Sequence, residues 1–307
     1  MADRPKIDLI VPRFVDNIPF YQAADQMGFH ALWFTEMLFS YDSWRGKSGL
    51  DRYGALTAAA SATSRIRLAT ALTGSPRPRI LPFATKMTDL DSLSGGRLSL
   101  GISQHDWPDE GVPEPRHPKI GGRLKETITV LKRLWSGPEV SFKGSRYNLE
   151  RASIDATPVQ LGGIPIFVDG ITSASVNQAA TLADGWVHPS GGIPGGAARG
   201  SDMVRKLATR AGRDPNSMEL GKIIYVSIDN HRFRAKARAR ERLAQRLQSF
   251  YGGYNVDSWC AFGKPAQCAA FINAFFDAGI TTVMLCLVPA DVEHLELLHR
   301  EVLPLLN

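Results

Sequence analysis

The sequence has few cysteines and no long hydrophobic run, and each shortage excludes a class of protein. The three cysteines, Cys260, Cys268 and Cys286, cannot form a paired framework, and none lies in a CxxC motif. We therefore expect free thiols in a reducing compartment. No run approaches the roughly 20 apolar residues that span a bilayer, and the apolar stretch near the N-terminus is too short for a signal peptide. These features predict a cytoplasmic protein without a membrane partner.

Several chemical motifs are also absent. The chain has no metal-ligand spacing, P-loop or nucleophile elbow, so we predict no metal site. One basic run, residues 231–246, holds six arginines and one lysine. Its charges are scattered around a helix and no aromatic platform accompanies them, which predicts a solvated or subunit-facing helix without a nucleic-acid partner. The net charge of +6 suits anionic ligands.

The pattern that is present is an alternation of short apolar runs with segments of helical spacing. The 307 residues are 44% hydrophobic and 21% charged, enough for a substantial core. The expected strands are 7–11, 30–35, 66–73, 97–102, 164–168, 185–188, 219–228 and 282–288, and the expected helices are 18–27, 53–62, 81–93, 122–135, 173–183, 197–211, 233–250 and 265–278. Near-continuous apolar strands indicate a parallel sheet covered by helices.

Eight such units favour an α/β fold of the (β/α)8 TIM-barrel type over a doubly wound sheet. We expect one domain, residues 1–307, with insertions after strands 2, 4 and 7 and an extended excursion over 138–163. In a barrel, every loop that follows a strand lies at one common mouth, where the chemistry takes place. The loops after strands 2, 4, 5 and 6 are polar and rich in glycine, so we expect the active site among them.

Each candidate residue at this mouth also has a structural interpretation. His105 has a side chain suited to general acid–base catalysis, or it pairs with Asp106 or Asp109 in the loop. Thr172 begins a helix whose amides suit a phosphate, although a plain helix cap has the same pattern. The glycine-rich stretch SGGIPGG (190–196) admits close approach of a ligand or is simply flexible. His188 ends a buried strand and is expected to line the pocket or to be structural.

Three stretches of the sequence resemble the bacterial-luciferase-like family of flavin and deazaflavin (F420) oxidoreductases. They are GFHALWFTE (28–36), residues 58–102 with AAASATSRIRLATALT and SGGRLSLGI, and PIFVDGITSASVNQAATLADGW (165–186). The resemblance covers most of the chain. It implies a luciferase-like barrel that holds F420 or FMN in its mouth, with the cofactor phosphate toward strands 5 and 6. It also implies a bulge behind the cofactor ring, formed by a cis peptide bond at Ala71–Leu72.

The resemblance assigns roles to residues that match the family's motifs. Glu36 takes the acidic position that contacts the ring, Gln104 and Asp109 take polar ring positions, and Asp106 takes the position of a catalytic acid. Two departures stand out. Met37 replaces a histidine found in many relatives, and Gly192 stands where relatives that use sugar phosphates carry a lysine. A phosphorylated sugar is therefore not the expected substrate.

The prediction is an oxidoreductase that uses F420 to transfer a hydride to or from a small organic substrate. The predicted catalytic residues are Glu36, His105 and Asp106. The predicted cofactor contacts are Glu36, Ala71, Leu72, Thr73, Gln104, Asp109, Gly170, Ile171, Thr172, Ser190 and Gly191, and the predicted substrate pocket is Met37, Tyr41, Trp44, Trp107 and His188. The alternatives are an FMN-dependent monooxygenase that uses O2, and a barrel that has lost its cofactor. By resemblance we also expect a homodimer, with a separate reductase as a possible supplier of reduced cofactor.

Overall fold

Eight parallel strands close into a barrel in the computed structural model, which describes residues 5–11, 17–35, 50–74, 79–103, 120–189, 191–247 and 255–307. In barrel order the strands are β1 (Lys6–Val11), β2 (Ala31–Thr35), β3 (Arg67–Gly74), β4 (Leu98–Ser103), β7 (Ile166–Asp169), β8 (Gly185–His188), β9 (Glu219–Ile228) and β11 (Thr282–Leu287). Pairing of β8 with β9 closes the ring. The predicted (β/α)8 barrel is confirmed.

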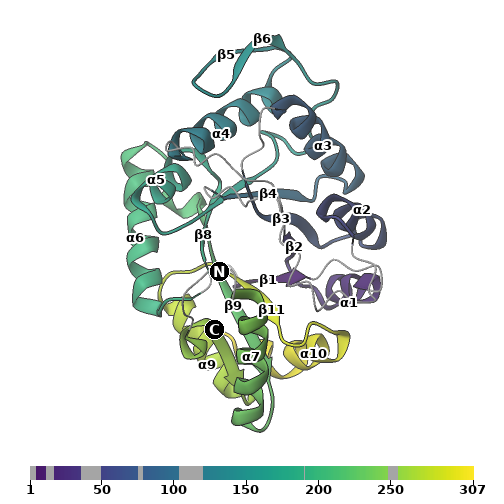
Figure 1. Cartoon of the computed structure of the whole chain (residues 1–307), viewed down its shortest axis with the longest axis vertical. Helices are drawn as coiled ribbons and strands as arrows, with labels where there is room; N and C mark the ends of the chain where they lie inside the picture. Colours follow the sequence, from purple (N-terminus) through teal and green to yellow (C-terminus); the bar gives the residue numbers. More distant parts are fainter. Residues whose placement is uncertain are drawn as a thin grey trace.

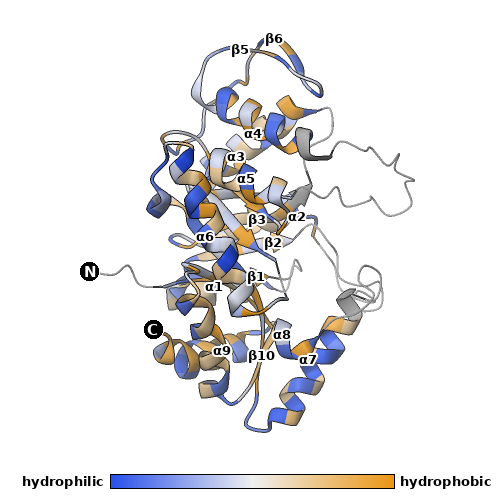
Figure 2. Cartoon of the chain, turned by 90° about the vertical axis from the view of Figure 1, so that its left-hand side faces the viewer, coloured by the Kyte–Doolittle hydropathy of each residue, from blue (hydrophilic) through white to orange (hydrophobic). Residues whose placement is uncertain are grey.

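The helices surround this ring of strands (Figure 1). They are α1 (Ile18–Met27), α2 (Arg52–Ala62), α3 (Ile80–Leu93), α4 (Ile120–Ser136), α5 (Ser173–Leu182), α6 (Pro194–Arg210), α7 (Arg232–Leu247), α8 (Val256–Trp259), α9 (Pro265–Asp277) and α10 (Val292–Leu297), with the short turns η3 (Pro215–Ser217), η4 (Leu298–Val302) and η5 (Leu303–Leu305). In Figure 2 the helices are hydrophilic mainly on their outer sides. Across the described ranges, every helix is too short or too polar to cross a membrane.

Two additions extend the barrel. The antiparallel pair β5 (Val140–Lys143) and β6 (Asn148–Ala152) projects beyond α4 (Figure 1), where the sequence predicted an inserted excursion. After β9 the chain forms α7, α8, β10 (Cys260–Gly263) and α9 before it returns to β11, which is the predicted insertion after strand 7. The predicted insertions after strands 2 and 4 fall on 36–49 and 104–119, outside the described residues.

The short strand β10 was not predicted. Only the start of β9, Glu219–Lys222, pairs with β8, so the edge of β9 beyond that point is open. Residues Cys260–Gly263 pair in parallel with Tyr225–Ile228 along this edge. β10 then lies between α9 and α7 (Figure 2). Four residues are too few for a period-2 pattern to stand out.

Alternation along each strand divides the buried side chains into two layers. One layer faces the helices and includes Leu32, Leu68 and Val283, and the other fills the barrel and includes Ile10, Trp33 and Phe167. Trp33 and Phe167 meet edge to face, with ring centroids 5.3 Å apart. The interior is therefore a packed core, so a ligand binds above it at the mouth.

Asp25 on α1 organises the turn between α2 and β3. Its removal tests how α1 is held against this turn. Its carboxylate accepts hydrogen bonds from the backbone N–H groups of Ser64, Arg65 and Ile66 at 2.9, 3.0 and 2.7 Å. Burial alone would raise the pKa of Asp25, but these donors together hold it below its ordinary value. The stabilisation is therefore present above the ordinary carboxyl pKa and is lost as pH falls through the lower pKa of the folded protein.

We expect Asp25→Ala to lower the free energy of unfolding by about 2–3 kcal/mol, because it strips the acceptor from three backbone donors. Asp25→Asn keeps one acceptor oxygen and should lose less. Denaturant unfolding at neutral and acidic pH measures both variants. Equal stability of wild type and Asp25→Ala at neutral pH would contradict this role.

Candidate active site

The inner face at the mouth of the barrel carries polar side chains on the side of β2, β4 and β7. Alternation places Thr35 of β2, Ser103 of β4 and Asp169 of β7 on the inner face at the C-terminal ends of their strands. All three are buried. On the opposite side the inner face carries Tyr225 of β9 and Cys286 of β11. Polar side chains therefore line the β2–β7 side of the mouth, and Asp169 is an addition to the residues predicted from the sequence.

A bulge at the end of β3 shapes the polar side. The pairing of β3 with β4 shifts register between Thr70 and Thr73, and Leu72 has a left-handed φ of 54°. The predicted bulge is thus present, but the predicted cis bond at Ala71–Leu72 is wrong. Among the described peptide bonds, only Val288–Pro289 is cis. The extra residue is accommodated by the left-handed conformation of Leu72 in place of a cis bond.

Gly101 of β4 allows this bulge to lie close to its neighbour. A Cβ added at Gly101 would lie 2.5 Å from the carbonyl oxygen of Thr70, 2.9 Å from Cζ3 of Trp33 and 3.0 Å from the amide nitrogen of Leu72. Such distances are too short for real carbon atoms. Glycine is therefore required where the bulge of β3 meets β4.

The turn from β7 into α5 forms an open helix N-terminus. Gly170 has φ 125°, and an added Cβ there would lie 2.5 Å from Oγ of Ser175. The side chain of Thr172 caps α5 by accepting from the amide of Ser175 at 3.2 Å. Within the described residues, the amides of Ser173 and Ala174 have no acceptor, as is usual in the first turn of a helix. These amides suit the phosphate of F420 or FMN, so the predicted cofactor phosphate fits this turn.

His188 ends β8 beside this turn and is neutral. It is 7% exposed, and its Nδ1 lies 3.0 Å from the carbonyl oxygen of Pro189. A carbonyl oxygen only accepts, so Nδ1 carries the hydrogen and Nε2 is left as an acceptor. Burial, and then the charge of Lys222, lower the pKa of His188 to about 4. The residue was predicted to line the substrate pocket at the mouth, and that role stays a prediction. In the structure its side chain borders a different cavity, between α5 and α6.

Lys222 on β9 is a candidate that our sequence analysis missed. It is 1% exposed, and its Nζ donates to the carbonyl oxygens of Pro189 at 2.5 Å and Ile223 at 2.9 Å. Burial lowers its pKa to about 7. A buried lysine in the middle of the largely apolar strand ELGKIIYVSI was the feature that could have revealed it. Through Pro189, Lys222 holds the start of the loop that carries Gly191.

Gly191 itself fits tightly against the rest of the fold. It has φ 86°, and an added Cβ would lie 2.6 Å from the indole of Trp259. The exposed side chain of Ile171 lies on the other predicted phosphate turn. The remaining predicted residues, namely Glu36, Met37, Tyr41, Trp44, Gln104, His105, Asp106, Trp107, Asp109 and Ser190, lie outside the described residues, as does the side chain of Thr73. Their roles stay predictions.

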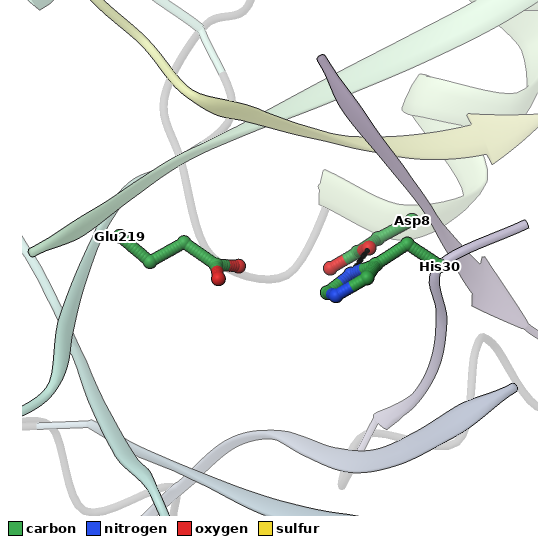
Figure 3. Close-up of side chains that lie close together, drawn as sticks. All are labelled: Asp8, His30 and Glu219. Carbon is green, nitrogen blue, oxygen red and sulfur yellow. Dashed lines mark hydrogen bonds and ion pairs between the residues drawn. The ribbon is translucent and has the colours of Figure 1, made fainter. Parts of the chain in front are cut away.

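A second polar cluster lies at the opposite, N-terminal end of the barrel (Figure 3). Asp8 is completely buried and accepts from Nε1 of Trp33 at 2.6 Å and from Nδ1 of His30 at 2.7 Å. Burial raises the pKa of Asp8 despite these donors. Ligand atoms of Asp8, His30 and Glu219 lie within 4.8 Å of one another, as in a metal site.

The surrounding charges argue against a metal at this cluster. Nζ of Lys6 lies 2.6 Å from Glu219, and Arg67 lines the same cavity. Two cations thus face two carboxylates, and a metal ion would meet no surplus of negative charge. Barrel enzymes also place their chemistry at the other end. We assign the cluster to closing the N-terminal end of the barrel.

The chain belongs to the luciferase-like monooxygenase family, whose sequence profile matches residues 5–256. This membership makes it an oxidoreductase of the luciferase-like class, as the sequence predicted. One relative is the F420-dependent glucose-6-phosphate dehydrogenase of Kineococcus radiotolerans, 26% identical over 294 residues that cover 85% of this chain and 84% of that protein.

Solved structures share the fold at low sequence identity. An F420-dependent secondary alcohol dehydrogenase in complex with an F420–acetone adduct aligns with a TM-score of 0.85 and 19% identity, covering 99% of this chain and 100% of that one. A long-chain alkane monooxygenase aligns with a TM-score of 0.79 and 16% identity, covering 99% and 91%. At these identities the likeness shows the luciferase-like barrel alone.

Proposed function

We propose that this protein is an F420-dependent oxidoreductase that transfers a hydride to or from a small organic substrate. The observation that carries the proposal is its similarity to a relative named for F420 dependence along more than four fifths of both chains. The turn from β7 into α5 supports it, because the open amides there suit the cofactor phosphate. We further propose that residues 1–307 form one domain and that the active protein is a homodimer.

In this proposal the cofactor and the residues around it have separate roles. F420, when bound, supplies the hydride chemistry at carbon C5 of its ring. The bulge at Leu72 would provide a surface for the cofactor ring, and Glu36 and Gln104, which follow β2 and β4 in the sequence, would contact the cofactor. Asp106 or His105 exchanges the proton with the substrate. A separate reductase is a candidate supplier of reduced cofactor.

The substrate differs from that of the Kineococcus relative in this proposal. Gly192 stands at the position of the lysine in relatives that use sugar phosphates, and it is exposed with φ 80°. An added Cβ would lie 3.3 Å from the ring of His188. Since glycine offers no cation here for a substrate phosphate, we propose an uncharged or weakly charged organic substrate.

Substitution of the two proton-exchange candidates tests the catalytic assignment. We expect at least one of Asp106→Asn and His105→Gln to lower kcat about 100-fold, the usual contribution of a positioned general acid or base. F420 affinity should stay unchanged within about twofold, since neither side chain holds the phosphate. Glu110→Gln, in the same loop, is the control and should retain full activity. Full activity in both test variants would refute the assignment.

The second candidate function is oxygen insertion with FMN. It is favoured by the fold shared with the long-chain alkane monooxygenase. Turnover with panels of alcohols and carbonyl compounds, with and without O2, separates the two reactions. We expect turnover with F420 in the absence of O2. Turnover that requires O2 and reduced FMN would favour the monooxygenase, and binding of neither cofactor would favour a barrel that has lost its cofactor.

A further inference from the structure

A cavity of about 510 Å³ lies between α5 and α6, outside the barrel wall. The two helices run side by side along the left edge of Figure 1, next to β8. Ile171 and Ser173 line the cavity at the turn that is predicted to hold the cofactor phosphate. Its volume is in the range of sites for organic ligands. We call it the α5–α6 cavity; it begins at the phosphate turn and leads away from the mouth.

One end of the α5–α6 cavity carries positive potential. The amides of Ser173 and Ala174 in α5, and of Gly195 in α6, have no acceptor among the described residues. Arg199 lines the cavity, and its guanidinium lies over the first turn of α6, 3.8 Å from where a Cβ of Gly195 would sit. No acidic partner of Arg199 occurs in the described part of the chain. Two helix N-termini and a guanidinium together attract anions.

His188 adds one hydrogen-bond acceptor to this end. Its side chain lines the cavity, and Nε2 has no hydrogen-bond partner in the described ranges. An acceptor that lines a cavity favours a ligand that donates a hydrogen bond. An N–H group of a ligand would satisfy Nε2, whereas a bare phosphate would not. The cavity therefore suits a ligand that has both an anionic group and a hydrogen-bond donor.

The walls between these polar groups are apolar. Val176, Trp186 and Leu207 line the inside, and Met203, which is half exposed, lies at the edge. Gly200 makes room for the indole of Trp186, because any Cβ there would overlap its ring. The surface suits short hydrocarbon segments between polar groups.

Building on the proposed F420 function, we propose that the α5–α6 cavity binds the tail of F420 beyond its phosphate, the lactyl and glutamyl groups. The tail carries amide N–H groups for Nε2 of His188, carboxylates for Arg199, and methyl and methylene groups for the wall formed by Trp186 and Met203. FMN ends at its phosphate and leaves this cavity empty. The cavity is then the part of the protein that distinguishes F420 from FMN.

Binding titrations with shortened deazaflavins test this proposal. The ligands are F420 and the deazaflavin 5′-phosphate that lacks both the lactyl and the glutamyl groups, and the readout is their own fluorescence. We expect Arg199→Gln to weaken F420 about tenfold, the loss of one charge-assisted contact, and to leave the deazaflavin 5′-phosphate unchanged. Arg210→Gln, in the last turn of α6 and away from the cavity, is the matched control and should bind both ligands normally.

A second pair of variants does not depend on Arg199. Met203→Glu should repel the tail and weaken F420 selectively, while Met203→Gln should not. If wild type binds F420 and neither Arg199→Gln nor Met203→Glu changes the preference for the full tail, the inference is overturned and the proposed function stands. If wild type binds no F420 at all, the proposed function fails and the inference fails with it.

Discussion

Replacing Gly101 with alanine will lower the free energy of unfolding by about 3 kcal/mol and abolish tight binding of the cofactor. The added methyl group would overlap the carbonyl of Thr70, the indole of Trp33 and the amide of Leu72. Two of these contacts are backbone atoms of the neighbouring strand β3 and cannot rotate away. Overpacking of this kind costs about 1–3 kcal/mol, at the upper end where backbone must move. Because the backbone that moves is the bulge, the surface behind the cofactor ring moves too.

The control for this experiment is Gly137→Ala. A Cβ at Gly137 would lie 3.6 Å from its nearest neighbour, an ordinary contact, so stability and binding should stay near those of wild type. Denaturant unfolding and cofactor titration measure both variants. A Gly101→Ala protein that is as stable as wild type and binds cofactor equally well would show that the bulge does not shape the site.

Replacing Lys222 with methionine will remove a large pH dependence of stability. Burial lowers the pKa of Lys222 from its ordinary value of 10.5 to about 7, so between these pH values the unfolded chain holds a proton that the folded protein lacks. Stability then rises with pH across this window, by about 5 kcal/mol in total. Methionine has a similar volume and no charge, and we expect it to be at least as stable as lysine at neutral pH.

The structure also predicts what Lys222→Met changes locally. The carbonyl of Pro189 keeps the donor Nδ1 of His188 but loses Nζ, so the loop that carries Gly191 should loosen. Unfolding free energies of wild type and variant at several pH values between 7 and 10.5 measure the difference directly. Lys143→Met, at an exposed position on β5, is the control. Its unfolding free energy should change with pH in the same way as that of wild type. If the difference in unfolding free energy between wild type and Lys222→Met stayed the same at every pH, Lys222 would not be neutralised by burial.

The fold could be predicted from the sequence because most strands have a local pattern of apolar residues bounded by turns. The runs at Gly185–His188 and Glu219–Ile228 are largely apolar and end at clear turns, and the structure has the same bounds. β10 could not be predicted, because it depends on an edge of β9 that opens only once β8 has ended. Pairing between distant segments is not encoded in local periodicity.

The candidate site was predicted in part for the same reason. The turn from Gly170 to Thr172 is local, and the structure has the expected helix cap. The geometry at Ala71–Leu72 depends on the tight fit to Gly101, and there resemblance alone predicted the wrong bond. Lys222 and His188 meet only through the carbonyl of Pro189, a contact between neighbouring strands that no spacing reveals.

Titration of the purified protein with F420 and with FMN, each oxidised and reduced, tests the central claim most directly. We predict micromolar binding of F420, with FMN at least about ten times weaker, a difference of about 1.4 kcal/mol. The preference should come from the tail, since both cofactors present a phosphate to the turn at Gly170. Equal affinity for the two cofactors, or tighter binding of FMN, would contradict the claim that this barrel is an F420-dependent oxidoreductase.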